Sequence, residues 1–162
     1  MPEVKDQIGK DGGMNYQNEG FEKGLRYQEF VCKMLGLVDY KKEQEQYDFG
    51  ETLFGVEIKF DDIMQNTGNL WIETAEKRNS NNDNWIDSGI KRQDNSWLYL
   101  IGNYKKAFCF LKNALIEYQA WHNKELPIVK NNSLTSQGFL LPTLIAKEIC
   151  VKEFVFPTVV GG

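Results

Sequence analysis

Residues 47–62 read Tyr-Asp-Phe-Gly-Glu-Thr-Leu-Phe-Gly-Val-Glu-Ile-Lys-Phe-Asp-Asp. Within this segment, residues 56–60 alternate apolar side chains with Glu57 and Lys59, a pattern that predicts a short and largely buried strand. Successive side chains of a strand point to opposite faces, so Glu57 and Lys59 share one face. Charged groups are rarely buried unless they are paired or bound to a metal. We therefore expect the rest of the chain to supply partners for this face.

An acidic residue precedes this strand at the distance of a hairpin. Asp48 is expected to approach Glu57 from a neighbouring strand, and two such carboxylates repel each other unless a cation lies between them. Oxygen ligands suit a hard ion such as Mg²⁺. Lys59 is placed to orient a metal-activated water and to stabilise the charge on an attacked phosphate. These residues favour phosphodiester hydrolysis.

The length and composition predict one globular domain. The chain has 162 residues, of which 41% are hydrophobic and 13% aromatic, enough for one core and too few for two. We expect the Trp and Phe residues to lie in that core. A net charge of −4 argues against a basic coat protein for nucleic acid, although a carboxylate site also makes a DNA enzyme acidic.

The cysteines and the apolar runs bear on the cellular compartment. Cys32, Cys109 and Cys150 are odd in number and far apart, which predicts reduced thiols and neither a disulfide framework nor a zinc site. No apolar run has the length of a membrane span, and no signal-peptide pattern opens the chain. The expectation is a cytoplasmic protein that does not bind membranes.

The order of predicted elements is α+β. Residues 1–19 are polar and rich in glycine, which predicts a flexible lead-in before a single domain over 20–162. Helical spacing predicts a first helix from about Gly20 to Gly36 and a second over 113–122. Alternation predicts strands at 69–73, 96–101, 107–111 and 154–156, and an edge or interrupted strand at 138–146 because of Pro142. This order is mixed and differs from an alternating doubly wound sheet.

The helix, Asp48 and Glu57-Ile58-Lys59 together resemble the signature of the PD-(D/E)XK nuclease superfamily, which includes restriction endonucleases and Holliday-junction resolvases. Residues 67–73 and 88–90 are similar to features of phage and bacterial members. The resemblance implies an αβββαβ core with a central mixed sheet flanked by helices. It also implies a Mg²⁺-dependent DNA endonuclease that accepts Mn²⁺ and acts as a homodimer. In that family Asp48, Glu57 and the Ile58 carbonyl would bind the metal, and Lys59 would act on the catalytic water.

The sequence offers further candidate site residues. Many resolvase-like members carry a Glu on the first helix, where this chain has Gln28 on the flank of the apolar stripe and Glu29 nearer the solvent side. Glu73 either completes the acidic cluster or is a solvated strand end. Phosphate contacts are expected from exposed polar and basic residues. These candidates are Ser88, Lys91, Arg92, Lys105 and Lys106.

Two other interpretations stay open. Glu57 and Lys59 are also compatible with an exposed ion pair of little energetic weight. The acidic charge and the absence of a first-helix Glu favour a non-catalytic DNA-binding or partner-binding module on the same core. No Gly-rich phosphate loop is present, which argues against kinases, ATPases and dehydrogenases.

Overall fold

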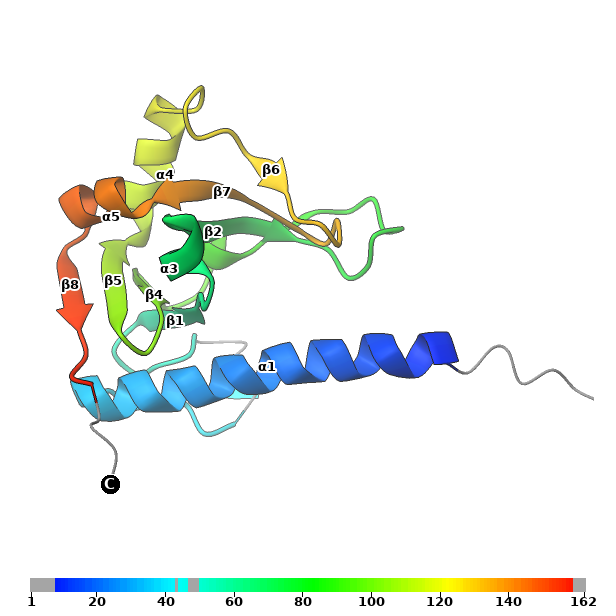
Figure 1. The fold of residues 1–162 in the computed structure, drawn as a ribbon, viewed down its shortest axis with the longest axis horizontal. Helices are drawn as coiled ribbons and strands as arrows, with labels where there is room; N and C mark the ends of the chain where they lie inside the picture. The colour runs from blue at the N-terminus through cyan, green and yellow to red at the C-terminus, as the bar shows by residue number, and fades with distance from the viewer. Residues whose placement is uncertain (1–7, 43, 47–49, 159–162) are drawn as a thin grey trace, which may run out of the picture.

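The structure, a computed structural model, describes residues 8–42, 44–46 and 50–158 (Figure 1). Its strands form two four-stranded sheets. The first sheet has the order β1-β4-β5-β8, in which β1 is parallel to β4 and the other neighbours are antiparallel. These strands are β1 (Val56–Phe60), β4 (Leu98–Gly102), β5 (Lys106–Leu111) and β8 (Lys152–Val155).

The second sheet is antiparallel and has the order β3-β2-β7-β6. Its strands are β2 (Asn69–Glu76), β3 (Ile86–Asp87), β6 (Val129–Lys130) and β7 (Ser136–Pro142). The helices are α1 (Ile8–Leu35), α3 (Met64–Thr67), α4 (Lys112–Trp121), α5 (Thr143–Ile149) and the 3₁₀ turn η1 (Gly89–Lys91). In Figure 1, α1 runs along one side of the molecule beneath β1, and the second sheet lies on the other side. No helix in the described part of the chain has the length and apolar character needed to span a membrane.

Strand β1 separates two apolar cores. Val56 and Ile58 pack with Tyr27 and Val31 of α1 in one core. The other core lies between the two sheets, where residues of β2, β4, β5 and β7 meet. Because side chains alternate along β1, Glu57 and Lys59 point away from α1, and they pair in register with Tyr99 and Ile101 of β4. The charged side chains of Glu57 and Lys59 therefore lie at the edge of the core between the two sheets.

Much of the predicted order is confirmed. The fold is α+β with a mixed sheet flanked by helices, and a second sheet is added to it. Helix α1 ends at Leu35, followed by Gly36 with a left-handed φ of 68°, as the glycine predicts. Strands β4 and β5 form the expected antiparallel hairpin. The specific αβββαβ core stays a prediction.

Helix α1 differs from the prediction at its start. It begins at Ile8, inside the segment predicted to be a flexible lead-in. Once a helix is anchored by a packed segment, each further residue adds one hydrogen bond, so the helix extends through residues of low propensity. Periodicity could not reveal this extension because it reports only the packed part of the helix.

Two other predictions are confirmed only in part. The strand predicted over 138–146 is interrupted at Pro142, where β7 ends and α5 begins, but β7 is not an edge strand, because it pairs with β2 on one side and, at Gln137 and Gly138, with β6 on the other. The tryptophans are not all in the core, since Trp97 is 58% exposed and Trp121 is 85% exposed. Trp121 lies six residues after the buried Leu115, which turns it about 240° around α4 and away from the core.

Candidate functional site

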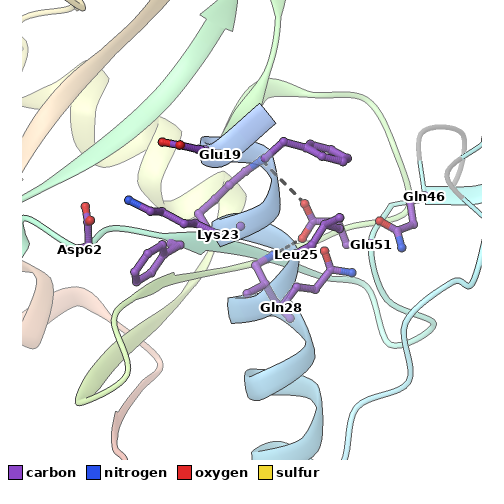
Figure 2. A pocket seen from close by; sticks show the side chains of 13 residues that line it. Glu19, Lys23, Leu25, Gln28, Gln46, Glu51 and Asp62 are labelled. Carbon is purple, nitrogen blue, oxygen red and sulfur yellow. Dashed lines mark hydrogen bonds and ion pairs between the residues drawn. The ribbon is translucent and has the colours of Figure 1, made fainter. Parts of the chain in front are cut away.

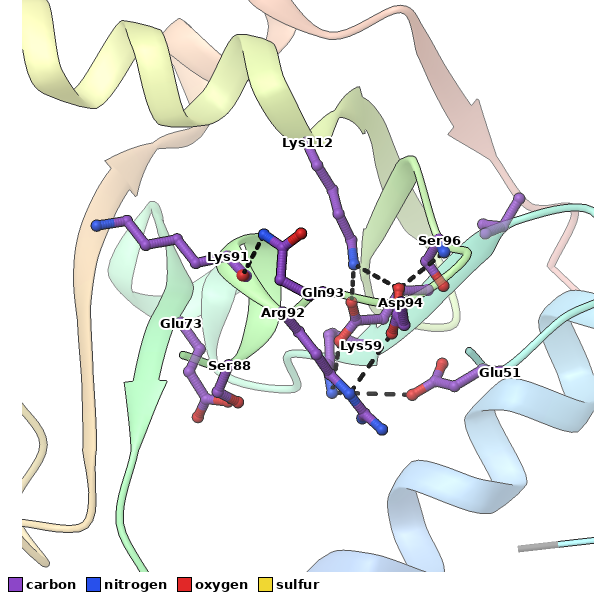
Figure 3. A network of polar contacts seen from close by, with 12 residues as sticks. Glu51, Lys59, Glu73, Ser88, Lys91, Arg92, Gln93, Asp94, Ser96 and Lys112 are labelled. Carbon is purple, nitrogen blue, oxygen red and sulfur yellow. Dashed lines mark hydrogen bonds and ion pairs between the residues drawn. The ribbon is translucent and has the colours of Figure 1, made fainter. Parts of the chain in front are cut away.

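Lys59 lies between two carboxylates on β1, the edge strand of the first sheet (Figure 3). Its Nζ is 3.1 Å from Oε1 of Glu57 and 3.8 Å from Oε1 of Glu51. The other oxygen of Glu51 accepts a hydrogen bond of 2.6 Å from the backbone N–H of Ile58. Glu51 therefore ties the loop before β1 to the strand itself and positions a second acid beside Lys59.

The network continues through Lys112, the first residue of α4. Its Nζ is 2.6 Å from Oε2 of Glu57 and 3.4 Å from Oδ1 of Asp94. Asp94 also pairs with Arg92, at 3.5 Å. The side chains of Glu57, Asp94 and Lys112 are each no more than 5% exposed. Three carboxylates thus alternate with three cationic groups, and the pairing offsets the cost of burying their charge.

The protonation of these groups follows from their neighbours. Burial alone raises the pKa of Glu57, but the ammonium groups of Lys59 and Lys112 outweigh it and hold that pKa below its usual value. Burial lowers the pKa of Lys59, yet Glu57 and Glu51 raise it well above the usual value. For Glu51, burial dominates over the attraction of Lys59, and the pKa is raised. Glu57 and Lys59 are therefore charged at neutral pH, and Glu51 is the carboxyl nearer to titration.

Two pockets meet at Lys59. The first, of about 600 Å³, lies between α1 and β1 and is lined by Gln28, Glu51 and Ile58 among others (Figure 2). The second, of about 580 Å³, lies between β1 and the second sheet. Lys59, Phe60 and Asp62 line both pockets. A ligand extended along the edge of β1 could therefore occupy both and pass Lys59.

The first helix presents Gln28 to this site and turns Glu29 away from it. Gln28 is 5% exposed and lines the first pocket. Glu29 is exposed and lines a separate, smaller depression with Asp39 and Lys41. The helical register derived from the apolar stripe is thus confirmed, and Glu29 lies outside the group that surrounds Lys59.

Glu73 is on the wall of the second pocket and is held by two hydroxyl groups. Ser88 donates to its Oε1 at 2.5 Å, and Ser136 donates to its Oε2 at 2.6 Å. Glu73 is therefore a fixed, partly buried carboxylate and not a solvated strand end. Ser88 is 6% exposed and its hydroxyl is bonded to Glu73, so its placement gives no support to the predicted DNA contact, which stays a prediction. Its hydroxyl is turned inward because Glu73 accepts from it.

The predicted basic contacts do not form one surface. Lys91 is the last residue of η1 and Arg92 follows it, both before β4, whereas Lys105 lies in the turn after β4 and Lys106 is the first residue of β5. Arg92 pairs with Asp94 and Lys106 pairs with Glu153, at 3.3 Å. Lys105 is exposed at the β4–β5 turn. No shared phosphate-binding role follows from their placement.

The donors near Lys59 are mostly oxygen atoms. Glu51, Glu57, the Ile58 carbonyl and the Gln28 amide offer the ligand chemistry that a hard cation such as Mg²⁺ prefers. Asp48, the first acid of the predicted site, lies outside the described residues. Over the residues that are described, no three His, Cys, Asp or Glu side chains gather as a metal-binding group. These donors suit a hard cation in chemical type, and both oxygens of Glu57 are paired with ammonium groups.

Sequence reasoning missed Glu51, Asp94 and Lys112. Glu51 lies within the 47–62 segment, but hairpin spacing favoured Asp48. Lys112 carried a usable signal, because a cation in the first turn of a helix opposes the helix dipole and needs a carboxylate nearby. Which carboxylate serves it depends on the tertiary fold.

Comparisons with known proteins leave the resemblance untested. No protein-family model, no curated protein and no solved structure matches this chain.

Proposed function

We propose that this chain is a metal-dependent DNA endonuclease. The observation that carries the proposal is Lys59, held between Glu51 and Glu57 at the junction of two pockets. A charged ammonium fixed in a cleft is suited to stabilise the negative charge that develops on a phosphate under attack. The resemblance of Asp48 and Glu57-Ile58-Lys59 to the PD-(D/E)XK signature supports the same chemistry.

The residues around Lys59 have separable roles in this proposal. Asp48, Glu57 and the Ile58 carbonyl would hold Mg²⁺ or Mn²⁺, which when bound lowers the pKa of water and polarises the phosphate. Lys59 neutralises the phosphate and orients the attacking water. Glu51, with its raised pKa, is placed to exchange a proton beside Lys59. Lys112 and Asp94 hold Glu57 in position from the buried side.

The test is cleavage of duplex, branched and single-stranded DNA with Mg²⁺, Mn²⁺ or EDTA. We expect Lys59→Ala to lower the rate by a factor on the order of 10²–10⁴, the range for loss of one charge-stabilising or proton-transferring group. Lys33→Ala, which removes an exposed lysine in the last turn of α1, is the matched control. Equal absence of cleavage by the wild type and Lys59→Ala with either metal would refute the proposal.

A second function is favoured by the ion pairs of Glu57. Both of its oxygens are within 3.1 Å of an ammonium group, an arrangement that a non-catalytic DNA-binding or partner-binding module would also use for stability. DNA affinity that survives both Asp48→Ala and Glu57→Gln, with no metal binding by calorimetry, would favour this module over the enzyme.

We extend the nuclease proposal to a homodimer, because cutting both strands of a duplex requires two sites or two binding events. Sedimentation velocity across a range of protein concentrations tests this extension. A monomer at all concentrations, with or without DNA, would contradict it.

A further inference from the structure

One stripe of α1 that faces the first pocket contains two glycines. Gly20, Gly24 and Gln28 are spaced by four residues, so they lie along one face of the helix, and all three line the pocket. A Cβ placed on Gly20 or Gly24 would meet no atom within 4 Å. Glycine is less favourable than alanine inside a helix. The packing of the described chain therefore gives no reason for these glycines, which keep open a space beside the helix.

Gln28, on the same face, holds an unused hydrogen-bond donor. Its side chain is 5% exposed, and its Nε2 has no hydrogen-bond partner among the residues that the structure describes. Figure 2 shows Gln28 and Glu51 directed toward the same space beside α1. Buried polar groups are almost always hydrogen-bonded, so the orphan donor beside this pocket leaves one hydrogen bond for a ligand acceptor to complete. Such an acceptor shares the first pocket with Lys59, which also lines it.

The two pockets differ in character, and together they suit a chain-like ligand. The first contains the cations Lys23 and Lys59 beside the glycine face. The second has an apolar wall in which Trp71 of β2 pairs with Leu140 of β7. A phosphodiester chain combines phosphate oxygens, which can accept hydrogen bonds from donors on the wall of the first pocket, with flat apolar bases, which stack on aromatic rings such as Trp71.

We propose that a single nucleic-acid strand binds along the glycine face of α1. Its sugar-phosphate backbone lies against Gly20 and Gly24, and Gln28 Nε2 donates to a non-bridging phosphate oxygen beside Lys59. The neighbouring base enters the second pocket against Trp71. This inference rests on the proposed function in that the bound phosphate is the one to be cut, and it names the substrate as single-stranded or locally unpaired DNA.

The charged residues of the first pocket determine how strongly it attracts such a strand. Glu19, Glu51 and Asp62 line it together with the two lysines. General attraction for phosphates is therefore weak, and binding depends on close contact with the helix face and on the Gln28 donor. Because few phosphates are neutralised, we expect affinity to fall only shallowly as salt rises.

The experiment measures binding of a fluorescently labelled single-stranded oligonucleotide in EDTA, where cleavage is suppressed. Gly24→Leu fills the space beside α1, and Gln28→Met removes the amide at similar volume. Each is expected to weaken binding by a factor on the order of ten or more. Gly24→Leu should also keep or raise Tm, because leucine favours a helix more than glycine does, so its loss of binding is not due to unfolding.

Met34→Trp adds bulk to an exposed part of α1 away from the pocket and is the matched control, expected to bind as the wild type does. Wild-type affinity in Gly24→Leu would overturn the inference, as would absence of binding by the wild type. The proposed function fails separately. A wild type that binds the strand, loses it in Gly24→Leu and never cuts it would refute catalysis and leave the glycine face as the binding surface.

Discussion

Replacing Lys112 by Met tests the buried ion pairs that hold Glu57. The substitution removes the ammonium 2.6 Å from Glu57 and 3.4 Å from Asp94 while keeping most of the side-chain volume. Removal of one partner from a buried ion pair costs about 3–5 kcal/mol. Glu57 keeps Lys59 and Asp94 keeps Arg92, so we expect a loss at the lower end, about 3 kcal/mol of unfolding free energy.

This loss of unfolding free energy corresponds to a measurable decrease in the melting temperature. For a domain of this size, 1 kcal/mol corresponds to roughly 2–4 °C, so Lys112→Met should lower Tm by about 6–12 °C at pH 7. Circular dichroism or calorimetry at fixed protein concentration gives the value. The double variant Glu57→Gln with Lys112→Met should lose less stability than the sum of the losses in the two single variants. Each single variant leaves one buried charge without its partner, whereas the double variant removes both charges.

The pH dependence gives a second readout. The pKa of Glu57 is lowered in the folded protein, so its contribution to stability is present above the unfolded pKa and is lost as pH falls through the folded pKa. Without Lys112 the pKa of Glu57 rises, and the Tm difference from the wild type should be largest near pH 7 and shrink in acid. A Tm change below about 2 °C, or a double variant whose effects simply add, would refute the ion-pair interpretation.

Two more predictions concern groups with a raised pKa. Glu51→Gln should raise Tm at pH 7, because a carboxyl whose pKa is raised in the folded protein destabilises that protein when ionised. The gain in Tm should vanish as pH falls below the unfolded pKa. The same variant should slow DNA cleavage, because it removes the group proposed to exchange a proton beside Lys59. No gain at pH 7 would contradict this. Burial raises the pKa of both Cys32 and Cys109 to about 11, so at pH 8 neither should react with a thiol reagent until denaturant is added. Because Cys150 is free and partly exposed, the labelled site is identified by peptide mapping, and rapid labelling of Cys32 or Cys109 in the folded protein would contradict this.

Local pattern in the sequence determined several parts of this protein correctly. Alternation in residues 56–60 placed Glu57 and Lys59 on one face of β1, and helical spacing turned Gln28 inward and Glu29 outward. Gly36 predicted the end of α1. These features succeeded because each depends on neighbours two to four residues away, which is the range over which side chains of a strand or helix share a face.

Only the tertiary structure decided which groups meet. Lys112 reaches Glu57 of β1 from the start of α4, and Glu73 of β2 accepts a hydrogen bond from Ser136, 63 residues away. The second sheet arises from the pairing of β2 with β7, and the two pockets arise where that sheet and α1 flank β1. Periodicity predicts the face of a strand or helix on which a side chain lies, but it does not predict the partner of that side chain. The partner depends on long-range contacts, which form as the whole core is buried. The strand at 56–60 could be recognised in the sequence, while the network around Lys59 required the fold.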